Sequence, residues 1–225
     1  MLTPVEDVTR VFADAVVEAF ASRPGPRFAL VLSGGSTARE CYEVLAEADG
    51  IDWSLVDVYV GDERFVPPDD DDANQRLIRE SLLDRVGGAG SFRPWDTALP
   101  DEACVAAYQR EIGDLVTGAG IDLIHLGMGP DGHTASLFAG SPALEADPGE
   151  LVTANVDPSG TNPHPRLTLT LPVINSARLA VFTVAGASKA DAVAALLRGD
   201  DIPAARVHAG RMLWLVDGPA RAAAP

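Results

Sequence analysis

Short apolar runs alternate with amphipathic stretches along most of this chain. Five runs have the length and residue content of buried strands, namely Phe28–Leu32, Val56–Val60, Ile121–Leu126, Leu179–Val184 and Met212–Val216. Between them, apolar residues recur at helical spacing within residues 5–20, 37–48, 77–83, 102–116 and 188–197. Strands that alternate with helices predict an α/β protein with a three-layer α/β/α, Rossmann-like architecture, in which helices cover both faces of a mainly parallel sheet.

Residues 139–171 interrupt this regularity. Several prolines break the pattern there, and the alternation within Arg166–Leu171 is typical of a half-buried strand. We therefore expect a small antiparallel excursion in the middle of the chain. The 225 residues contain no internal repeat, and this length is typical of one large domain. The prediction is a single domain over residues 1–225.

Three helix starts are predicted from side chains that cap helices. In a capping box, the capping residue is followed three positions later by Glu or Gln. This spacing occurs at Thr3 with Glu6, Thr37 with Glu40, and Asp72 with Gln75. Proline, which favours the first position of a helix, follows Thr3. The first helix is therefore expected to begin next to the start of the chain.

Composition narrows the possible partners. The formal net charge is -16, from 17 basic and 33 acidic residues, which argues against nucleic acid and anionic membranes because their phosphates would be repelled. Hydrophobic residues make up 47% of the chain, enough for a sizeable core, yet no run is long enough to cross a membrane. Cys41 and Cys104 lie far apart and no signal peptide is recognisable, so we expect reduced thiols in a cytoplasmic protein.

The first candidate site is the glycine-rich turn that follows the run Phe28–Leu32. It consists of Ser33, Gly34, Gly35, Ser36 and Thr37. Glycines let a backbone curl around a ligand, and the helix that follows would present free N–H groups and the positive end of its dipole. The pattern favours a cradle for a phosphate or a sugar, although a plain strand–helix turn could have the same residues.

The second candidate follows the run Val56–Val60 and contains Asp62, Glu63 and Arg64. Parallel strands end at the same edge of a sheet, so this segment is expected close to the glycine-rich turn. Arg64 could meet an anion while Asp62 or Glu63 orients a partner, and Asn74 could add a hydrogen bond. A charged turn on the surface is the alternative.

The third candidate follows the run Ile121–Leu126 and contains Gly127, Gly129, Asp131, Gly132 and His133. Histidine suits proton transfer near neutral pH, and the surrounding glycines indicate close approach by a ligand. The glycines also satisfy the spacing of a dinucleotide-binding turn. No clear second strand ending in an acidic residue follows, which disfavours that interpretation. His125, inside the run, is expected to be a packed core residue.

Two cations downstream complete the candidate set. Arg166 begins an alternating strand, and Lys189, the one lysine of the chain, falls in the first turn of a predicted helix. A cation is unfavourable at a helix N-terminus because the dipole there attracts anions. Lys189 makes sense at that position if it shares a bound anion with the helix end, although a solvated lysine is the simpler alternative.

Taken in order, these motifs resemble those of the 6-phosphogluconolactonase family, the lactonase branch of a wider group that includes glucosamine-6-phosphate deaminase. Between residues 30 and 189 the chain carries L-S-G-G-S-T, G-D-E-R-F-V-P, G-M-G-P-D-G-H-T-A-S-L-F, P-R-L-T-L-T and G-A-S-K-A. Each motif alone is weak, whereas the ordered set is specific. The segments 64–67 and 136–138 favour the lactonases over the deaminases, which usually have tyrosine after the D-E pair.

The resemblance implies hydrolysis of 6-phospho-D-glucono-1,5-lactone to 6-phospho-D-gluconate, the second step of the oxidative pentose phosphate pathway, without a metal or an organic cofactor. His133 would be the general base that activates water, and Asp131 would orient it. Arg64 or the N–H groups of residues 127–132 would stabilise the oxyanion. The phosphate and the rest of the substrate would be held by Arg64, Arg166, Lys189, the turn at residues 33–37, Asp62, Asn74 and Gly129.

Two alternatives stay open from the sequence. An amino-sugar-phosphate isomerase or deaminase would use Asp62 to move a proton between carbons, and a sugar-phosphate-binding regulator would keep the pocket without turnover. Neither length nor charge leaves room for the DNA-binding module that such regulators usually carry. We expect a small sugar-phosphate lactone as the partner, and a monomer or a weak dimer.

Overall fold

A computed structural model describes residues 2–222 of the chain. Within these residues the main sheet has seven strands, and each neighbouring pair is parallel. Their spatial order is β1 (Leu2–Pro4), β10 (Arg211–Val216), β9 (Leu179–Val184), β6 (Leu123–Leu126), β2 (Phe28–Leu32), β3 (Val56–Val60) and β5 (Ser91–Arg93). The predicted mainly parallel sheet is confirmed, and β2, β3 and β9 have the predicted bounds. The short strands β1 and β5 were not predicted.

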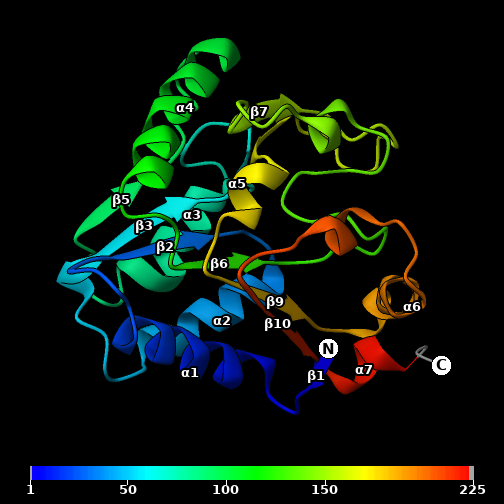
Figure 1. Ribbon diagram of the computed structural model, residues 1–225, viewed down its shortest axis with the longest axis horizontal. Coiled ribbons are helices and arrows are strands. Elements are labelled where there is room, and N and C mark those ends of the chain that lie inside the picture. Colours follow the sequence, from blue (N-terminus) through cyan, green and yellow to red (C-terminus); the bar gives the residue numbers. More distant parts are fainter. Residues whose placement is uncertain (1, 223–225) are drawn as a thin grey trace.

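Helices cover both faces of this sheet, as the alternation predicted. In Figure 1, α1 (Val8–Ala21) and α2 (Ser36–Ala46) lie below the sheet, whereas α4 (Asp101–Thr117) and α5 (Leu171–Asn175) lie above it. The remaining helices are α3 (Asn74–Ile78), which continues into a π-helical turn at Arg79–Leu83, α6 (Ala190–Arg198) and α7 (Gly218–Arg221). Short 3-10 turns occur at Trp53–Leu55, Pro142–Glu145, Ala187–Lys189 and Pro203–Arg206.

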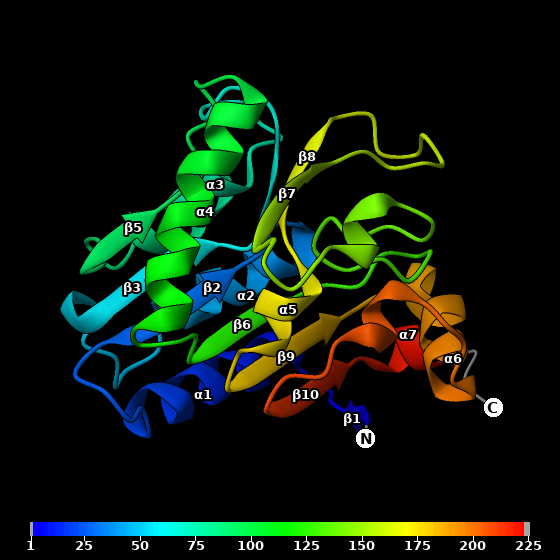
Figure 2. The same ribbon diagram turned by 45° about the horizontal axis from the view of Figure 1, so that its top comes forward.

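A second, antiparallel sheet stands on the first. Its order is β4 (Asp62–Arg64), β8 (Arg166–Leu169) and β7 (Val152–Asn155), and Figure 2 shows β7 and β8 rising above the main sheet. The expected antiparallel excursion is confirmed, but one detail of the prediction is wrong. β8 is buried throughout rather than half-buried, because it is the central strand of its sheet. The segment after β3, for which a surface turn was the alternative, is an edge strand of this sheet.

Buried apolar side chains between the layers explain why the sequence periods produce these elements. Every residue of β2 and β9 is buried, as expected for strands that are covered on both faces. α1 buries Phe12, Val16 and Phe20, which recur every fourth residue along one stripe. Burying one such side chain contributes roughly 1.5–3 kcal/mol, so many similar contributions hold the layers together.

The first helix does not begin where the capping-box spacing predicted. Thr3 belongs to β1 and lies opposite Leu215 of β10. α1 begins at Val8, and its cap is Asp7, whose carboxylate accepts the backbone N–H of Arg10. The prediction was wrong because pairing with the sheet satisfies the backbone of the first residues, which a local pattern does not reveal.

The other two predicted caps are also wrong. α2 begins at Ser36, one residue before Thr37, and has no side-chain cap. α3 begins at Asn74, and neither Asp72 nor the residue between them caps it with a side chain. The cap of α3 comes from Glu63 on β4, which is remote in the sequence.

The strand order creates a crevice at the carboxyl edge of the main sheet. From β2 the chain continues to β3 on one side, whereas from β6 it continues to β9 on the other side. Loops that follow two such strands diverge, and open α/β sheets bind ligands in the gap between them. The loops concerned are residues 33–37 and 127–133. The first and third candidate motifs therefore meet at this point.

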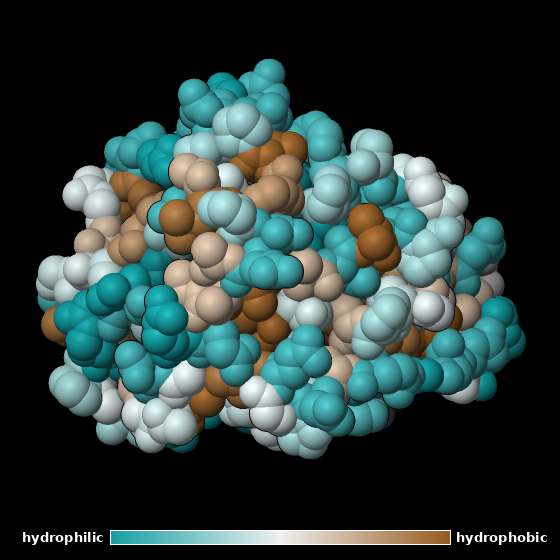
Figure 3. All heavy atoms as spheres, turned by 90° about the horizontal axis from the view of Figure 1, so that it is seen from above, coloured by the Kyte–Doolittle hydropathy of each residue, from teal (hydrophilic) through white to brown (hydrophobic). Residues whose placement is uncertain are grey.

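Few large apolar side chains are exposed on the surface of the described residues. Across residues 2–222, no helix has the length and apolar character that a membrane crossing requires. The large apolar side chains that stand exposed in the described part are Leu99, Val156 and Leu197. On the face shown in Figure 3, hydrophobic groups are small and separated by hydrophilic ones.

Candidate active site

A cavity of about 410 Å³ opens at the crevice between the loops after β2 and β6. The loop after β9, strand β4 and the segment that leads into β8 complete its walls. The predicted site residues that line it are Ser33, Gly34, Gly35, Ser36, Thr37, Asp62, Arg64, Asn74, Gly129, His133, Arg166 and Lys189. The remaining predicted residue, Asp131, contacts His133. Segments that are far apart in the sequence are therefore brought together as expected.

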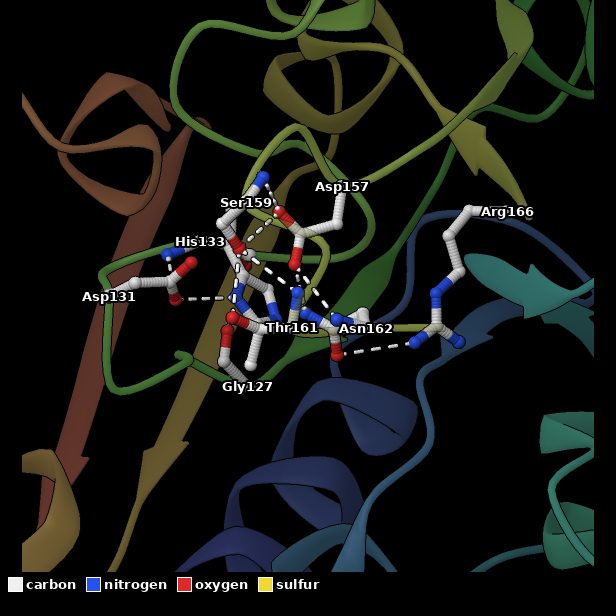
Figure 4. A network of polar contacts seen from close by, with 9 residues as sticks. Gly127, Asp131, His133, Asp157, Ser159, Thr161, Asn162 and Arg166 are labelled. Carbon is white, nitrogen blue, oxygen red and sulfur yellow. Dashed lines mark hydrogen bonds and ion pairs between the residues drawn. The ribbon is translucent and has the colours of Figure 1, made fainter. Parts of the chain in front are cut away.

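His133 and Asp131 form a close pair at the wall of this cavity. Nδ1 of His133 lies 2.6 Å from Oδ1 of Asp131, and Figure 4 shows the carboxylate beside the ring. The hydrogen bond from His133 lowers the pKa of Asp131, so this group is a carboxylate and only accepts. The proton of a neutral imidazole is therefore on Nδ1, and Nε2 keeps a free lone pair that can accept a proton.

Gly129 makes room for this pair. A Cβ atom at this position would collide with the imidazole of His133 and with the carboxylate of Asp131. The N–H of Gly129 donates to the carbonyl of His133 at 2.8 Å, which closes the turn. Glycine is therefore required at position 129, because the side chains of Asp131 and His133 approach its backbone closely.

The backbone of the histidine turn offers fewer free donors than predicted. The N–H groups of Gly129, Gly132 and His133 donate to His133 O, Gly129 O and Asp131 Oδ1, at 2.8, 3.0 and 3.3 Å. These three groups cannot also stabilise an oxyanion unless the turn opens. Of the donors expected for that role, Arg64 is the charged one that lines the cavity.

Arg166 is a buried cation with unused donors. Its residue is only 6% exposed, and Nη2 donates to Oδ1 of Asn162 at 3.3 Å. Among residues 2–222, its Nε and Nη1 have no hydrogen-bond partner. Burial and, to a lesser degree, the neighbouring Arg64 lower the pKa of Arg166. A guanidinium that is removed from water without a counter-ion is costly, and a bound anion would relieve that cost.

Two further cations face the same cavity. Arg64 lies opposite Arg166 in the antiparallel register of β4 and β8, and its Nη1 donates to the carbonyl of Asp72 at 2.6 Å. Lys189 precedes α6, at the end of a 3-10 turn, and burial lowers its pKa whereas Asp131 opposes that shift. Three cations thus converge on one cavity in a chain of net charge -16, which favours a strongly anionic ligand.

Glu63 holds the second candidate motif together from the inside. It is completely buried, and its carboxylate accepts the N–H groups of Arg64, Asn74 and Gln75 at 2.8, 2.6 and 2.8 Å. Burial raises its pKa to about 7. The alternative of a charged surface turn is therefore wrong for Glu63, which is a structural cap rather than a group that meets the ligand.

Asn74 and Asp62 are fixed by neighbours from other segments. Nδ2 of Asn74 donates to the carbonyl of Asp62 at 2.7 Å, whereas its Oδ1 is buried and, within the described residues, has no donor. A Cβ at Gly34 would overlap this amide, so Gly34 permits the close approach of α3. The Asp62 carboxylate accepts the hydroxyl of Ser136 at 2.8 Å. The hydroxyl of Ser136 is thereby committed, which disfavours a role as nucleophile.

A buried polar network supports the glycine-rich turn from below. The hydroxyl of Tyr42 accepts the N–H of Ser33 at 3.0 Å and lies 2.7 Å from its carbonyl. The hydroxyl of Ser33 donates to the carbonyl of His125 at 2.9 Å, and the His125 ring lies 2.8 Å from both Tyr42 and Thr183. Ser33 therefore anchors the turn with its N–H and its hydroxyl, and neither donor is free for a ligand.

His125 is the packed core residue that was predicted. It is completely buried, and burial lowers its pKa to about 3. The imidazole is therefore neutral at physiological pH. It lies under the cavity and supports the turn above it rather than exchanging protons with a ligand.

The dinucleotide-binding interpretation is wrong. That motif requires a helix directly after its glycines, so that the helix N-terminus can face the pyrophosphate. β6 is instead followed by turns, and the next helical segment begins only at Pro142. The described residues, 2–222, also contain no group of three or more His, Cys, Asp or Glu side chains placed to hold a metal ion.

Several residues of the cavity were missed by the sequence patterns. They are Met128, Ala135, Ser136, Phe138, Asn162, Thr183 and Ser188. Ala135 has a φ of 47°, a left-handed conformation that costs roughly 1–3 kcal/mol for a residue with a side chain and is found mainly at functional sites. Asn162 lies in the proline-rich region, where no period or spacing marks it. Met128, Ala135, Ser136, Phe138 and Ser188 lie inside motifs of the sequence but were not singled out there, whereas no local signal marks Asn162 or Thr183.

Comparison with known proteins finds relatives of this chain in both sequence and structure. The family model described as glucosamine-6-phosphate isomerases/6-phosphogluconolactonase matches residues 4–214. A 6-phosphogluconolactonase of Synechocystis sp. is 39% identical over 200 residues, which cover 84% of this chain and 81% of that relative. The crystal structure of 6-phosphogluconolactonase from Thermotoga maritima has a TM-score of 0.83 and 34% identity, and the match covers 96% of this chain and 99% of the other.

A monomeric glucosamine-6-phosphate deaminase has the same architecture. Its structure also has a TM-score of 0.83 and the match covers 99% of both chains, but the sequences are only 19% identical. At this identity the likeness shows the fold alone. Because both kinds of enzyme share the fold, residues of the site have to distinguish them.

Proposed function

The chain belongs to the family of glucosamine-6-phosphate isomerases and 6-phosphogluconolactonases, and we propose that His133 is the general base with which it opens a sugar-phosphate lactone. The reaction is the hydrolysis of 6-phospho-D-glucono-1,5-lactone to 6-phospho-D-gluconate, in the oxidative pentose phosphate pathway. The pairing of His133 with Asp131, at the wall of a cavity lined by three cations, is the observation that carries this mechanism.

In the first step, Nε2 of His133 accepts a proton from water while the water oxygen forms a bond to C1 of the lactone. The carbonyl oxygen of C1 then carries the negative charge. When this tetrahedral intermediate collapses, the bond between C1 and the ring oxygen breaks, and Nε2–H returns the proton to the ring oxygen. General acid–base assistance of this kind is worth roughly 10²–10⁴-fold in rate. Asp131 keeps the imidazole in the required tautomer and stabilises the imidazolium that forms.

Two of the three cations bind the other end of the substrate. Arg166 and Lys189, together with residues 34–37 of the glycine-rich turn, hold the dianionic phosphate, which satisfies the free donors of Arg166. Arg64 is placed to stabilise the developing oxyanion, since three N–H groups of the histidine turn are engaged within that turn. Fixing the phosphate positions the carbonyl carbon beside the base.

His133→Ala tests the proposal directly. The rate of acid release from freshly prepared 6-phosphogluconolactone, corrected for spontaneous opening, should fall by roughly 10²–10⁴-fold in kcat with a nearly unchanged KM. Lys189→Ala should mainly raise KM, and only for the phosphorylated lactone. A His133→Ala variant with the kcat of the parent protein would exclude His133 as the base.

The deaminase remains the second candidate because the fold is shared. Asp62, which a deaminase would use to move a proton, is buried at the cavity wall, and its Oδ2 accepts the hydroxyl of Ser136, which supports an anchoring role. Higher identity to the lactonases, 39% and 34% against 19%, also supports the lactonase. Release of ammonia from glucosamine-6-phosphate would identify the deaminase. Stabilisation by a sugar phosphate without any acid release would identify a non-catalytic binding protein.

The setting of the reaction follows from the same proposal. We place the enzyme in the cytoplasm, as a monomer or a weak dimer formed by a single domain over residues 1–225. The exposed large apolar side chains of the described part are few, which supports a weak tendency to associate. Light scattering across a range of protein concentrations measures this directly, and a stable dimer at micromolar concentration would contradict it.

A further inference from the structure

In the loop between β7 and β8, the carboxylate of Asp157 is the centre of a hydrogen-bond network. The Asp157 residue is 8% exposed. Its Oδ1 accepts the N–H and the hydroxyl of Ser159 at 2.8 and 2.7 Å, and its Oδ2 accepts the N–H and Nδ2 of Asn162 at 3.0 and 2.7 Å. Figure 4 shows Asp157 above Asn162, with Arg166 on the other side of the amide.

The charge of Asp157 dictates how the amide of Asn162 is oriented. Burial alone would raise the pKa of Asp157, but hydrogen bonds from Asn162 and Ser159 outweigh it and lower the pKa. Asp157 is therefore a carboxylate and only accepts hydrogen bonds. The NH₂ group of Asn162 must face it, so the amide oxygen must face the other way. That oxygen accepts from Nη2 of Arg166 at 3.3 Å.

This arrangement gives Arg166 an acceptor that carries no charge. A carboxylate in contact with Arg166 would neutralise the guanidinium and compete with an incoming anion. Asn162 supplies the oxygen and keeps the charge of Asp157 on the far side of the amide. Nε and Nη1 of Arg166 stay unpaired among residues 2–222 and are left for a ligand.

We propose that Asn162, oriented by Asp157, is a positioning residue that holds the Arg166 guanidinium ready for the phosphate of the substrate. The inference deepens the function proposed above and rests on it. Asn162 touches Arg166 and lines the cavity, so it acts on phosphate binding through Arg166 rather than on the reacting carbon. The assignment predicts a change in KM and leaves the chemical step alone.

Two variants and a matched control test the assignment. Asn162→Ala removes the acceptor of Arg166, and Asp157→Asn removes the charge that orients the amide. Each should raise KM for the phosphorylated lactone by about ten- to hundredfold, the range for one lost hydrogen bond to a charged group, while kcat changes less than about twofold. Ser159→Ala removes one hydrogen bond to Asp157 but keeps the N–H of Ser159 and both donors of Asn162 on that carboxylate, so it should keep the parent KM. Turnover of the unphosphorylated lactone should not change in any variant.

A double-mutant cycle separates positioning from a loss of loop structure. If Asn162 works through Arg166, Asn162→Ala should cause no further increase in KM when Arg166 is already alanine. An undiminished increase in the Arg166→Ala background, or a parent-like KM in Asn162→Ala alone, would overturn the proposal. Thermal unfolding of each variant shows whether it is folded at the assay temperature.

Calorimetric titration with 6-phosphogluconate, and separately with inorganic phosphate, provides a readout that does not depend on turnover. Weaker binding in Asn162→Ala and Asp157→Asn, but not in Ser159→Ala, would support the assignment even if the parent protein released no acid from the lactone. In that event the proposed reaction would fail while the role of Asn162 would stand. Equal binding by all variants, with an active parent enzyme, would exclude the role of Asn162 and leave the proposed reaction standing.

Discussion

At the scale of single residues, the direction of each hydrogen bond decides what a side chain can do. A carboxylate only accepts, so Asp131 leaves Nε2 of His133 free, and Asp157 turns the oxygen of Asn162 toward Arg166. Glu63 also accepts, and its two side-chain oxygens cap the backbone N–H groups of Asn74 and Gln75. Identical residue types thus serve different ends, according to which donors surround them.

Asp131→Asn tests the first of these roles. The amide has nearly the same size, but it has lost the charge and can present either its oxygen or its nitrogen to Nδ1 of His133. We expect kcat to fall, by at most the roughly 10²–10⁴-fold that general acid–base assistance is worth, with little change in KM. Steady-state kinetics with the phosphorylated lactone measures both values. An unchanged kcat would show that the ring is held without Asp131.

Much at the residue scale was predictable because it is local. His133, Asp131 and Gly129 lie within five positions of one another, so a short motif contains the whole pair and the glycine that accommodates it. Asn162 was not predictable, because its partner Arg166 is identified only by the folded loop. Ser33 was assigned to the ligand, whereas its donors are used by Tyr42 and His125.

At the scale of elements, helix starts were the weakest predictions. The capping-box spacing at Thr3 was overridden by the pairing of β1 with β10, and the cap of α3 comes from a different strand. Elements themselves were predicted well, since a period of hydrophobic residues extends over many positions. Their ends depend on single contacts, which tertiary structure can replace.

Asp7→Ala should destabilise the protein through α1. Its carboxylate accepts the N–H of Arg10 at 2.9 Å and the hydroxyl of Thr9 at 2.7 Å, and loss of such a cap typically costs about 1 kcal/mol in the free energy of unfolding. Thr3→Ala is the matched control and should change it by less than about 0.5 kcal/mol. Denaturant unfolding compares the two. A larger effect for Thr3→Ala would restore the capping box that the fold contradicts.

Glu63→Gln should alter both stability and its pH dependence. One backbone N–H that now meets an acceptor would face an NH₂ group, which should lower the free energy of unfolding by about 1–3 kcal/mol at neutral pH. Burial raises the pKa of Glu63 in the folded protein from its ordinary 4.5 to about 7. Folding therefore favours the protonated form, and the contribution of this group to stability decreases as pH rises from about 4.5 to about 7.

Denaturant unfolding at a series of pH values measures this contribution. The parent protein should lose stability across that window relative to Glu63→Gln, in which the group no longer titrates. Glu150→Gln, at an exposed position, is the control and should follow the parent curve. Parallel curves for the parent and Glu63→Gln would mean that Glu63 titrates equally in the folded and unfolded chains.

At the scale of the whole molecule, the cations at the cavity are opposite in sign to the net charge of the chain. The chain has a net charge of -16, yet Arg64, Arg166 and Lys189 face one cavity. Cations gathered without enough counter-charge repel one another, as the lowered pKa of Arg166 indicates, burial being its first cause and Arg64 the next. A bound dianion should therefore stabilise the fold as a whole.

Product binding measures that stabilisation. At a 6-phosphogluconate concentration about 100 times its Kd, the free energy of unfolding should rise by about 2.7 kcal/mol. For a chain of this size this corresponds to an increase in Tm of roughly 5–10 °C. The same concentration should produce a much smaller shift in Arg166→Ala. Equal shifts in both proteins would show that Arg166 does not hold the phosphate.

The sequence by itself determined the fold class, most strands and the motifs of the site, because hydrophobic periods and glycine-rich turns are local properties of the chain. It also contains the pair of His133 and Asp131 within one short motif, since the two residues are two positions apart. Only the tertiary structure decided which donors and acceptors meet across segments. It paired Thr3 with the sheet, buried Glu63 under α3, and placed Asn162 between Asp157 and Arg166. Those contacts join residues whose separation in the chain carries no repeating pattern, so spacing alone cannot reveal them.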